Sequence, residues 1–119
     1  MNTKVRKVKR DDLLFPELSY QILGALFNVW TEIGFGHKEK IYQRAVAMGF
    51  QKNGLNAQEQ APVKVIYQSE PVGIYYLDFL IESTVVLEIK VGNYFSKKDI
   101  EQLYSYLKAL DLKLGILAH

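Results

Sequence analysis

Three charged residues interrupt an apolar stretch of this sequence and could together carry out metal-assisted chemistry. Asp78 lies in one apolar run, and Glu88 and Lys90 lie in the next, after a turn-like segment at residues 82–84. Burying a charge costs free energy unless the charge is paired or bound to a metal ion. Side chains alternate along a strand, so Glu88 and Lys90 share one face. We therefore interpret these three residues as a candidate site.

The residue types favour hydrolysis of a phosphodiester bond. Carboxylate and carbonyl oxygens are the ligands that Mg²⁺ prefers, and Asp78, Glu88 and the backbone carbonyl of Ile89 would supply them. Lys90 would orient the attacking water and stabilise charge on the phosphate. The predicted cofactor is Mg²⁺ or Mn²⁺. The alternative is an ion pair between Glu88 and Lys90, since an Asp followed by Glu-x-Lys is a weak pattern by itself.

The elements that must position these residues follow from hydrophobic periodicity and turn signals. Predicted helices and strands, in the order α-α-β-β-β-α-β, cover residues 16–33, 38–52, 60–67, 72–81, 84–91, 96–110 and 113–118. The last strand–helix–strand unit predicts a parallel pair, whereas the two earlier hairpins are antiparallel. We expect a mixed α/β (α+β) fold, with a four-stranded mixed sheet flanked by helices.

Helical spacing also predicts which side chains are buried. Trp30 is expected in the core rather than at a ligand site. The second helix is predicted to bury four residues: Ile41, Ala45, Val46 and Met48. The helix that begins after Ser96 is predicted to bury five: Ile100, Leu103, Tyr104, Leu107 and Leu110. Ser96 and Asp99 have the spacing of a capping box at its start.

Length and composition limit the function classes. With 119 residues, 49% of them hydrophobic, the chain is expected to form one folded domain. The absence of cysteine excludes disulfides, thiolate zinc sites and cysteine nucleophiles. No apolar run approaches the ~18 residues of a membrane span, so we expect a cytoplasmic protein with no membrane partner.

Charge is concentrated at the N-terminus. Residues 1–10 carry five basic side chains and no acidic one. The remaining ten basic and thirteen acidic residues give residues 11–119 a charge of −3. We predict a basic, flexible arm at residues 1–15, followed by a single domain at 16–119. Such an arm fits a nucleic-acid partner, and a solvated tail is the alternative.

Two further patterns lie on predicted helices. Gly36, Glu39 and Tyr42 spell Gly-x-x-Glu-x-x-Tyr at the start of the second helix. Gln102 and Tyr106 lie four residues apart, and therefore on one side, of the last helix. Four patterns in this order are more specific than any one of them.

These motifs, over roughly residues 19–118, make the chain resemble the PD-(D/E)XK nuclease superfamily. Within it, the chain is similar to the small GxxExxY proteins, with the Q-x-x-x-Y helix motif of the RecB-like branch. The resemblance implies a restriction-endonuclease-like fold, a divalent-metal nuclease site and DNA as substrate. It makes Glu39 an additional acidic residue of the catalytic and metal site. It gives Gln102 and Tyr106 a substrate-positioning role, to which we add Lys97 and Lys98 at the start of the same helix.

Other interpretations remain open from the residues alone. Glu39 could be a favourable acid in the first helical turn, Gln102 a solvated helix residue, and Tyr106 a core residue. The chain could also be a catalytically silent module that binds nucleic acid or a protein, or a homodimer with an unrelated carboxylate metal site. Because the chain is short, target specificity is expected to come from a larger protein partner, from a second copy or from structure in the DNA.

Overall fold

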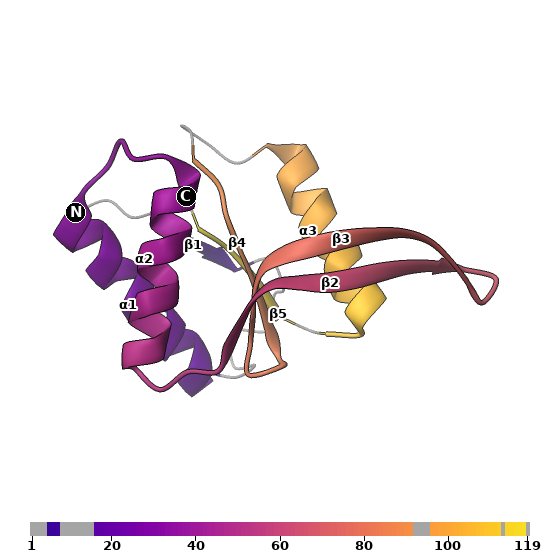
Figure 1. Ribbon diagram of the computed structural model, residues 1–119, viewed down its shortest axis with the longest axis horizontal. Coiled ribbons are helices and arrows are strands. Elements are labelled where there is room, and N and C mark those ends of the chain that lie inside the picture. The colour runs from indigo at the N-terminus through magenta and orange to yellow at the C-terminus, as the bar shows by residue number, and fades with distance from the viewer. Residues whose placement is uncertain (1–4, 8–15, 92–95, 113, 119) are drawn as a thin grey trace.

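Helices and strands follow one another in the order β-α-α-β-β-β-α-β in the computed structural model, which describes residues 5–7, 16–91, 96–112 and 114–118 (Figure 1). The elements are β1 (Val5–Lys7), α1 (Pro16–Ile33), α2 (Glu39–Lys52), β2 (Ala57–Tyr67), β3 (Glu70–Ile81), β4 (Val85–Ile89), α3 (Lys97–Leu110) and β5 (Leu114–Ala118). The helix boundaries agree with the sequence prediction within one residue. Strands β2 and β3 begin three and two residues earlier than predicted.

The strands form one mixed sheet with the order β1-β5-β4-β3-β2. Strands β4 and β5 are parallel and the other neighbours are antiparallel, which confirms the predicted parallel pair and hairpins. The predicted four-stranded mixed sheet corresponds to β2–β5. A fifth, three-residue strand, β1, pairs with β5 at the sheet edge. A three-residue strand with two basic residues carries no periodic signal in the sequence.

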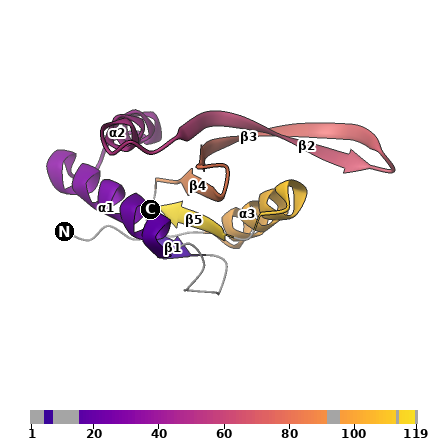
Figure 2. The same ribbon diagram turned by 90° about the horizontal axis from the view of Figure 1, so that it is seen from below.

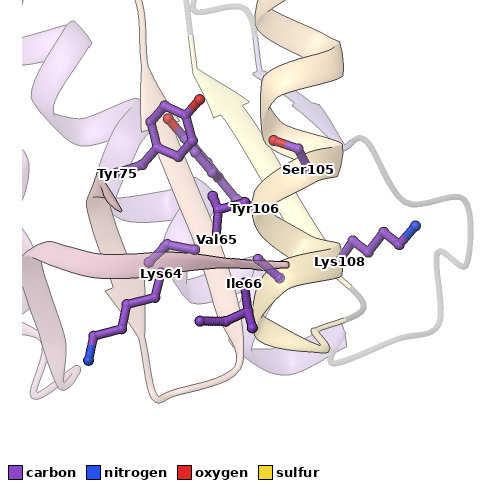
Figure 3. A pocket seen from close by; sticks show the side chains of 9 residues that line it. Lys64, Val65, Ile66, Tyr75, Ser105, Tyr106 and Lys108 are labelled. Carbon is purple, nitrogen blue, oxygen red and sulfur yellow. The ribbon is translucent and has the colours of Figure 1, made fainter. Parts of the chain in front are cut away.

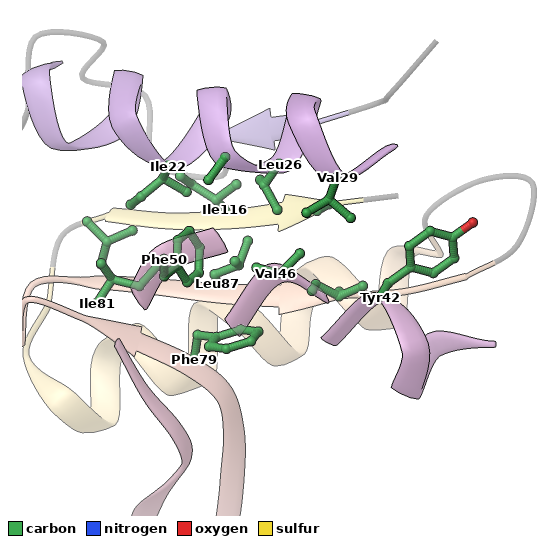
Figure 4. Packing of buried hydrophobic residues seen from close by; sticks show 14 of the residues in the cluster. Ile22, Leu26, Val29, Tyr42, Val46, Phe50, Phe79, Ile81, Leu87 and Ile116 are labelled. Atoms are coloured by element: carbon green, nitrogen blue, oxygen red, sulfur yellow. The ribbon is translucent and has the colours of Figure 1, made fainter. Parts of the chain in front are cut away.

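Two hydrophobic clusters lie on the two faces of the sheet. Side chains alternate along β4, so that Leu87 joins the cluster beneath α1 and α2, whereas Val86 joins the cluster beneath α3. Figure 4 shows the first cluster, in which α1 and α2 residues pack against Phe79, Ile81 and Ile116 of the strands. Burial on both faces explains why β4 reads as an unbroken apolar run.

The pairing of α1 with α2 is fixed by an aromatic contact. The rings of Trp30 and Tyr42 stack with centroids 4.4 Å apart and an interplanar angle of 6°. Trp30 is 2% exposed, as predicted for a core residue. The predicted apolar stripe of α2 was partly wrong: Ile41 and Met48 are exposed, and the buried residues are Tyr42, Val46 and Phe50. The stack with Trp30 rotates α2 so that its aromatic residues face the core.

Helix α3 begins and ends with local hydrogen bonds. Ser96 Oγ accepts from the Asp99 N–H at 3.1 Å, and Asp99 Oδ2 accepts from the Ser96 N–H at 3.1 Å, which confirms the capping box. The buried residues of α3 are Leu103, Tyr106 and Leu107, so the prediction that Tyr104 is buried was wrong. The rotation of α3 about its own axis decides which tyrosine faces the core.

Strands β2 and β3 form a long hairpin whose outer half extends beyond the rest of the molecule (Figures 1 and 2). The ladder is interrupted between the pairs Glu59↔Phe79 and Ala61↔Leu77, at Gln60 and Asp78. Gln60 has a positive φ of 51° at this point. On one side of the interruption Phe79 packs toward α1 and α2, and on the other Leu77 packs toward α3. Local irregularities of this kind redirect side chains, here at a candidate site residue.

Candidate active site

Asp78 and Glu88 each accept a hydrogen bond from a backbone N–H of the other residue's strand. The Asp78 N–H donates to Glu88 Oε2 at 2.7 Å, and the Ile89 N–H donates to Asp78 Oδ2 at 2.7 Å. The register Phe79↔Leu87, continued by one residue, sets Asp78 opposite Glu88 on the β3–β4 pair. The two predicted site residues are therefore brought together, as expected from their positions on adjacent strands.

Helix α2 adds two residues to this pair. Gln43 Nε2 donates to Asp78 Oδ1 at 3.1 Å and lies 3.4 Å from Glu39 Oε2. The amide thus bridges the carboxylate from α2 and the carboxylate from β3. Gln43 was not predicted as a site residue. Its position four residues after Glu39, on the same side of the helix, was the signal that could have found it.

The Gly-x-x-Glu-x-x-Tyr pattern has a structural explanation in the turn before α2. The Tyr42 hydroxyl donates to the Gly34 carbonyl at 2.6 Å and accepts from the His37 N–H at 3.3 Å. Gly36 has a φ of +94°, a conformation that L residues with a side chain rarely adopt. Gly36 and Tyr42 therefore shape the turn that ends at the first residue of α2, which is Glu39.

Burial raises the pKa of all three carboxyl groups, and repulsion from Asp78 adds to the rise for Glu88 and Glu39. Desolvation is the largest cause for Glu88, whose pKa rises from 4.5 to about 7, with the charge of Asp78 adding to the rise. Desolvation also raises the pKa of Asp78, against the Ile89 N–H and Lys90, which lower it. The pKa of Glu39 is raised by desolvation and then by Asp78. Three carboxyl groups that resist ionisation at one place are typical of a functional site.

Lys90 provides positive charge beside these carboxylates. It lowers the pKa of Asp78, Glu88 and Glu39, so its ammonium group lies close enough to act on all three. Its backbone N–H donates to the Ala118 carbonyl at 2.9 Å, which ties the end of β4 to β5. Lys90 is half-buried rather than fully solvated.

Helix α3 places the remaining predicted residues at different depths. Tyr106 is 4% exposed, so its ring is in the core, as the alternative interpretation held. Gln102 is half-buried one turn earlier. Lys97 and Lys98 are exposed in the first turn, and Lys97 Nζ lies 3.9 Å from Glu101 Oε1. The substrate-binding role of these four residues stays a prediction.

The donor set fits a hard divalent cation in its chemistry. Asp78, Glu88 and Glu39 supply carboxylate oxygens only, and a cation would stabilise the charged forms that burial disfavours. Within the described ranges, no three acidic, histidine or cysteine side chains are already grouped as metal ligands. Both strand carboxylates instead accept hydrogen bonds from backbone N–H groups.

Comparison with known proteins decides the family. The family model of the PD-(D/E)XK nuclease superfamily matches residues 16–119. The chain belongs to this superfamily. The match begins at the first residue of α1 and covers the candidate site, and the mixed sheet with its flanking helices is consistent with a restriction-endonuclease-like fold.

The comparison sets limits as well. No curated protein and no solved structure matches the chain. The narrower resemblance to the GxxExxY proteins and the RecB-like branch stays a prediction. In the part of the chain that the structure describes, no helix is long and apolar enough to cross a membrane.

Proposed function

We propose that this protein is a divalent-metal-dependent nuclease that hydrolyses phosphodiester bonds of DNA. The observation that carries the proposal is a chain of hydrogen bonds: Gln43 links Glu39 of α2 to Asp78 of β3, and Asp78 is linked in turn to the β4 strand that carries Glu88. The charge of Lys90 acts on all three carboxylates. Membership of a nuclease superfamily supports the same reaction class.

Each residue has a distinct role in this proposal. Asp78, Glu88, the Ile89 carbonyl and Glu39 would hold Mg²⁺ or Mn²⁺, which when bound polarises the phosphate and acidifies water. Lys90 orients the attacking water and stabilises negative charge that develops on the phosphate. Gln43 keeps the α2 carboxylate and the β3 carboxylate at a fixed separation. Such positioning residues contribute by holding the reacting groups in place.

The surface beside α2 suits the sugar–phosphate backbone. A cavity there is lined by three basic residues, Lys38, Lys40 and Arg44, and by one acid, Glu59. Gln43 lines the same cavity and bonds to Asp78, which connects the basic surface to the site. Basic residues supply most of the sequence-independent affinity for DNA. This cavity provides the phosphate contacts that the proposed function needs.

A second candidate function follows from the same hydrogen bonds. Asp78 and Glu88 accept from backbone N–H groups across the β3–β4 pair, which is a structural use of both carboxylates. A catalytically silent module that binds DNA or a protein would keep them for this purpose. Cleavage, rather than binding, separates the two candidates.

A cleavage assay with matched variants tests the proposal. Wild-type protein, Asp78→Asn and Asp111→Asn are incubated with linear, circular, single-stranded and branched DNA, with EDTA or with Mn²⁺. Asp111 is the control because it is exposed at the C-terminus of α3. We expect Mn²⁺-dependent cleavage by wild type and Asp111→Asn, and none by Asp78→Asn. Cleavage by Asp78→Asn at the wild-type rate would contradict the proposal, and binding without cleavage by any protein would favour the silent module.

A further inference from the structure

A second cavity lies between the β2–β3 hairpin and α3, on the other side of the site from α2. Its volume is about 520 Å³, within the range of about 300–1,000 Å³ typical of ligand sites. Figure 3 shows Tyr75 and Tyr106 together at one end, with Lys64 and Lys108 extending away on either side. The residues that line it are Val63, Lys64, Val65, Ile66, Tyr75, Ser105, Tyr106, Lys108 and Ala109.

The lining combines an open aromatic ring with positive charge. Tyr75 is 46% exposed, and its ring centroid lies 5.4 Å from that of the buried Tyr106. Val63 lies opposite Tyr75 on the hairpin and adds an apolar surface. The cavity lining contains two lysines and no acidic residue. A flat apolar group attached to a phosphate complements this combination.

Tyr106 connects the cavity to the candidate site. Burial raises its pKa to about 12, and the negative charges of Glu88 and Asp78 are further causes. Tyr106 also packs in one cluster with Leu77, the neighbour of Asp78 in β3, and with Val86, which shares a face of β4 with Glu88. A strand whose phosphate lies at the carboxylates could continue past Tyr106 into the cavity.

We propose that this cavity binds one unpaired nucleotide next to the scissile phosphate, with its base stacked on Tyr75 and with Lys64 and Lys108 at the cavity margin attracting the phosphates of the adjoining strand. The inference rests on the proposed function, because it names the substrate class of that same site: nucleic acid with a single-stranded segment. A base in a duplex is stacked on both sides and cannot offer its face to Tyr75. Aromatic stacking is tolerant of sequence because every base has a π-face.

Binding without metal tests the inference independently of cleavage. Fluorescence anisotropy in EDTA measures the Kd of full-length protein for a thymidine oligonucleotide and for a blunt duplex. Tyr75→Ala should weaken oligonucleotide binding about tenfold, equivalent to ~1.4 kcal/mol, and leave duplex binding unchanged. Tyr75→Phe should bind as wild type. Tyr76→Ala is the matched control, because Tyr76 is the adjacent residue, is 56% exposed and does not line the cavity.

A second pair of variants tests the charge. Lys64→Ala with Lys108→Ala should reduce the salt dependence of oligonucleotide binding by roughly 0.7 in log–log slope for each phosphate that is no longer neutralised. Lys52 is an exposed lysine on α2, and Lys52→Ala should leave the salt dependence unchanged.

A replacement is available if Tyr75→Ala does not fold. Tyr75→Leu keeps apolar contact with Tyr106 and removes the aromatic face.

Three results would overturn the inference. The first is an equal loss of oligonucleotide affinity in Tyr75→Ala and Tyr76→Ala. The second is unchanged affinity in both Tyr75→Ala and Tyr75→Leu. The third is a loss of duplex affinity in Tyr75→Ala as large as its loss of oligonucleotide affinity. Sedimentation that shows a dimer dissociated by Tyr75→Ala, with DNA binding intact, would assign the surface to a second copy instead. A Tyr75 effect without cleavage of any DNA would reject the nuclease and keep the nucleotide site. If wild type and Tyr75→Ala both cleave DNA and bind it with equal Kd, the nuclease is kept and the nucleotide site is rejected.

Discussion

At the scale of single residues, the site contains one side chain whose protonation should control stability. Glu88 is 4% exposed and has a pKa of about 7 in the folded state, against 4.5 when unperturbed. The folded state binds the Glu88 proton more tightly than the unfolded state does. The resulting contribution to the free energy of unfolding is therefore fully present below pH 4.5. That contribution is lost as the pH rises through about 7. Ionised Glu88 therefore opposes folding when no metal is bound.

Glu88→Gln should remove this penalty, since the carbonyl of the introduced amide can still accept from the Asp78 N–H. In EDTA, the variant should unfold at a higher temperature than wild type at about pH 8 and show a flatter pH dependence above about pH 5. The difference is on the order of 3 kcal/mol, from the shift in pKa. Thermal melts with and without Mg²⁺ measure it, and Glu59→Gln, exposed on β2, is the control. A variant that melts lower than wild type in both buffers would instead support the ion pair between Glu88 and Lys90.

At the scale of elements, α3 and β5 approach so closely that a side chain at one glycine position would press against a buried residue. A Cβ at Gly115 would lie 3.0 Å from three atoms of the buried Leu103 side chain. This contact fixes the depth of α3 on the sheet, and therefore the positions of Tyr106 and the cavity beside it.

Gly115→Ala should lower the free energy of unfolding by about 1–3 kcal/mol, because Leu103 must move out of its packed position. Gly73→Ala, on β3, is the matched control: no atom lies within 4 Å of the added Cβ. Reduced freedom of the unfolded chain should leave that control equal to wild type or more stable by a few tenths of a kcal/mol. Urea denaturation of the three proteins measures both effects. Equal stability of Gly115→Ala and wild type would show that Leu103 does not limit the approach.

At the scale of the whole molecule, the two edges of the sheet carry different elements. The β2–β3 hairpin extends from one edge of the sheet, and β1, with Arg6 and Lys7, forms the other edge (Figure 2). The principal extents of 47 × 28 × 24 Å reflect the hairpin. The proposed role of the basic residues in the N-terminal arm is to add phosphate contacts.

Deleting residues 1–10 should weaken DNA binding and flatten its salt dependence, by up to roughly 0.9 in log–log slope for each phosphate that the arm neutralises. Because the deletion also removes β1, a full-length control separates charge from structure. That control replaces five basic residues by Gln: Lys4, Arg6, Lys7, Lys9 and Arg10. Anisotropy titrations at several salt concentrations measure the slope. Slopes equal to wild type for both proteins would show that the arm does not contact DNA.

Some features were determined by local sequence chemistry. Helix α3 begins directly after Ser96, because the side chains of Ser96 and Asp99 satisfy N–H groups that a helix start leaves unpaired. Asp78 and Glu88 could be expected on adjacent strands because a tight turn in an apolar run predicts a hairpin. The parallel β4–β5 pair followed from the intervening helix.

Other features were decided only by the tertiary structure, because they depend on how elements rotate against one another. Gln43 bonds to Asp78, 35 residues away, only once the Trp30–Tyr42 stack has set the rotation of α2. Tyr106 rather than Tyr104 faces the core because α3 is rotated about its axis so that Leu103, Tyr106 and Leu107 lie against the sheet. The pKa of Glu88 depends on burial beneath elements distant in sequence, which no spacing of residue types reveals.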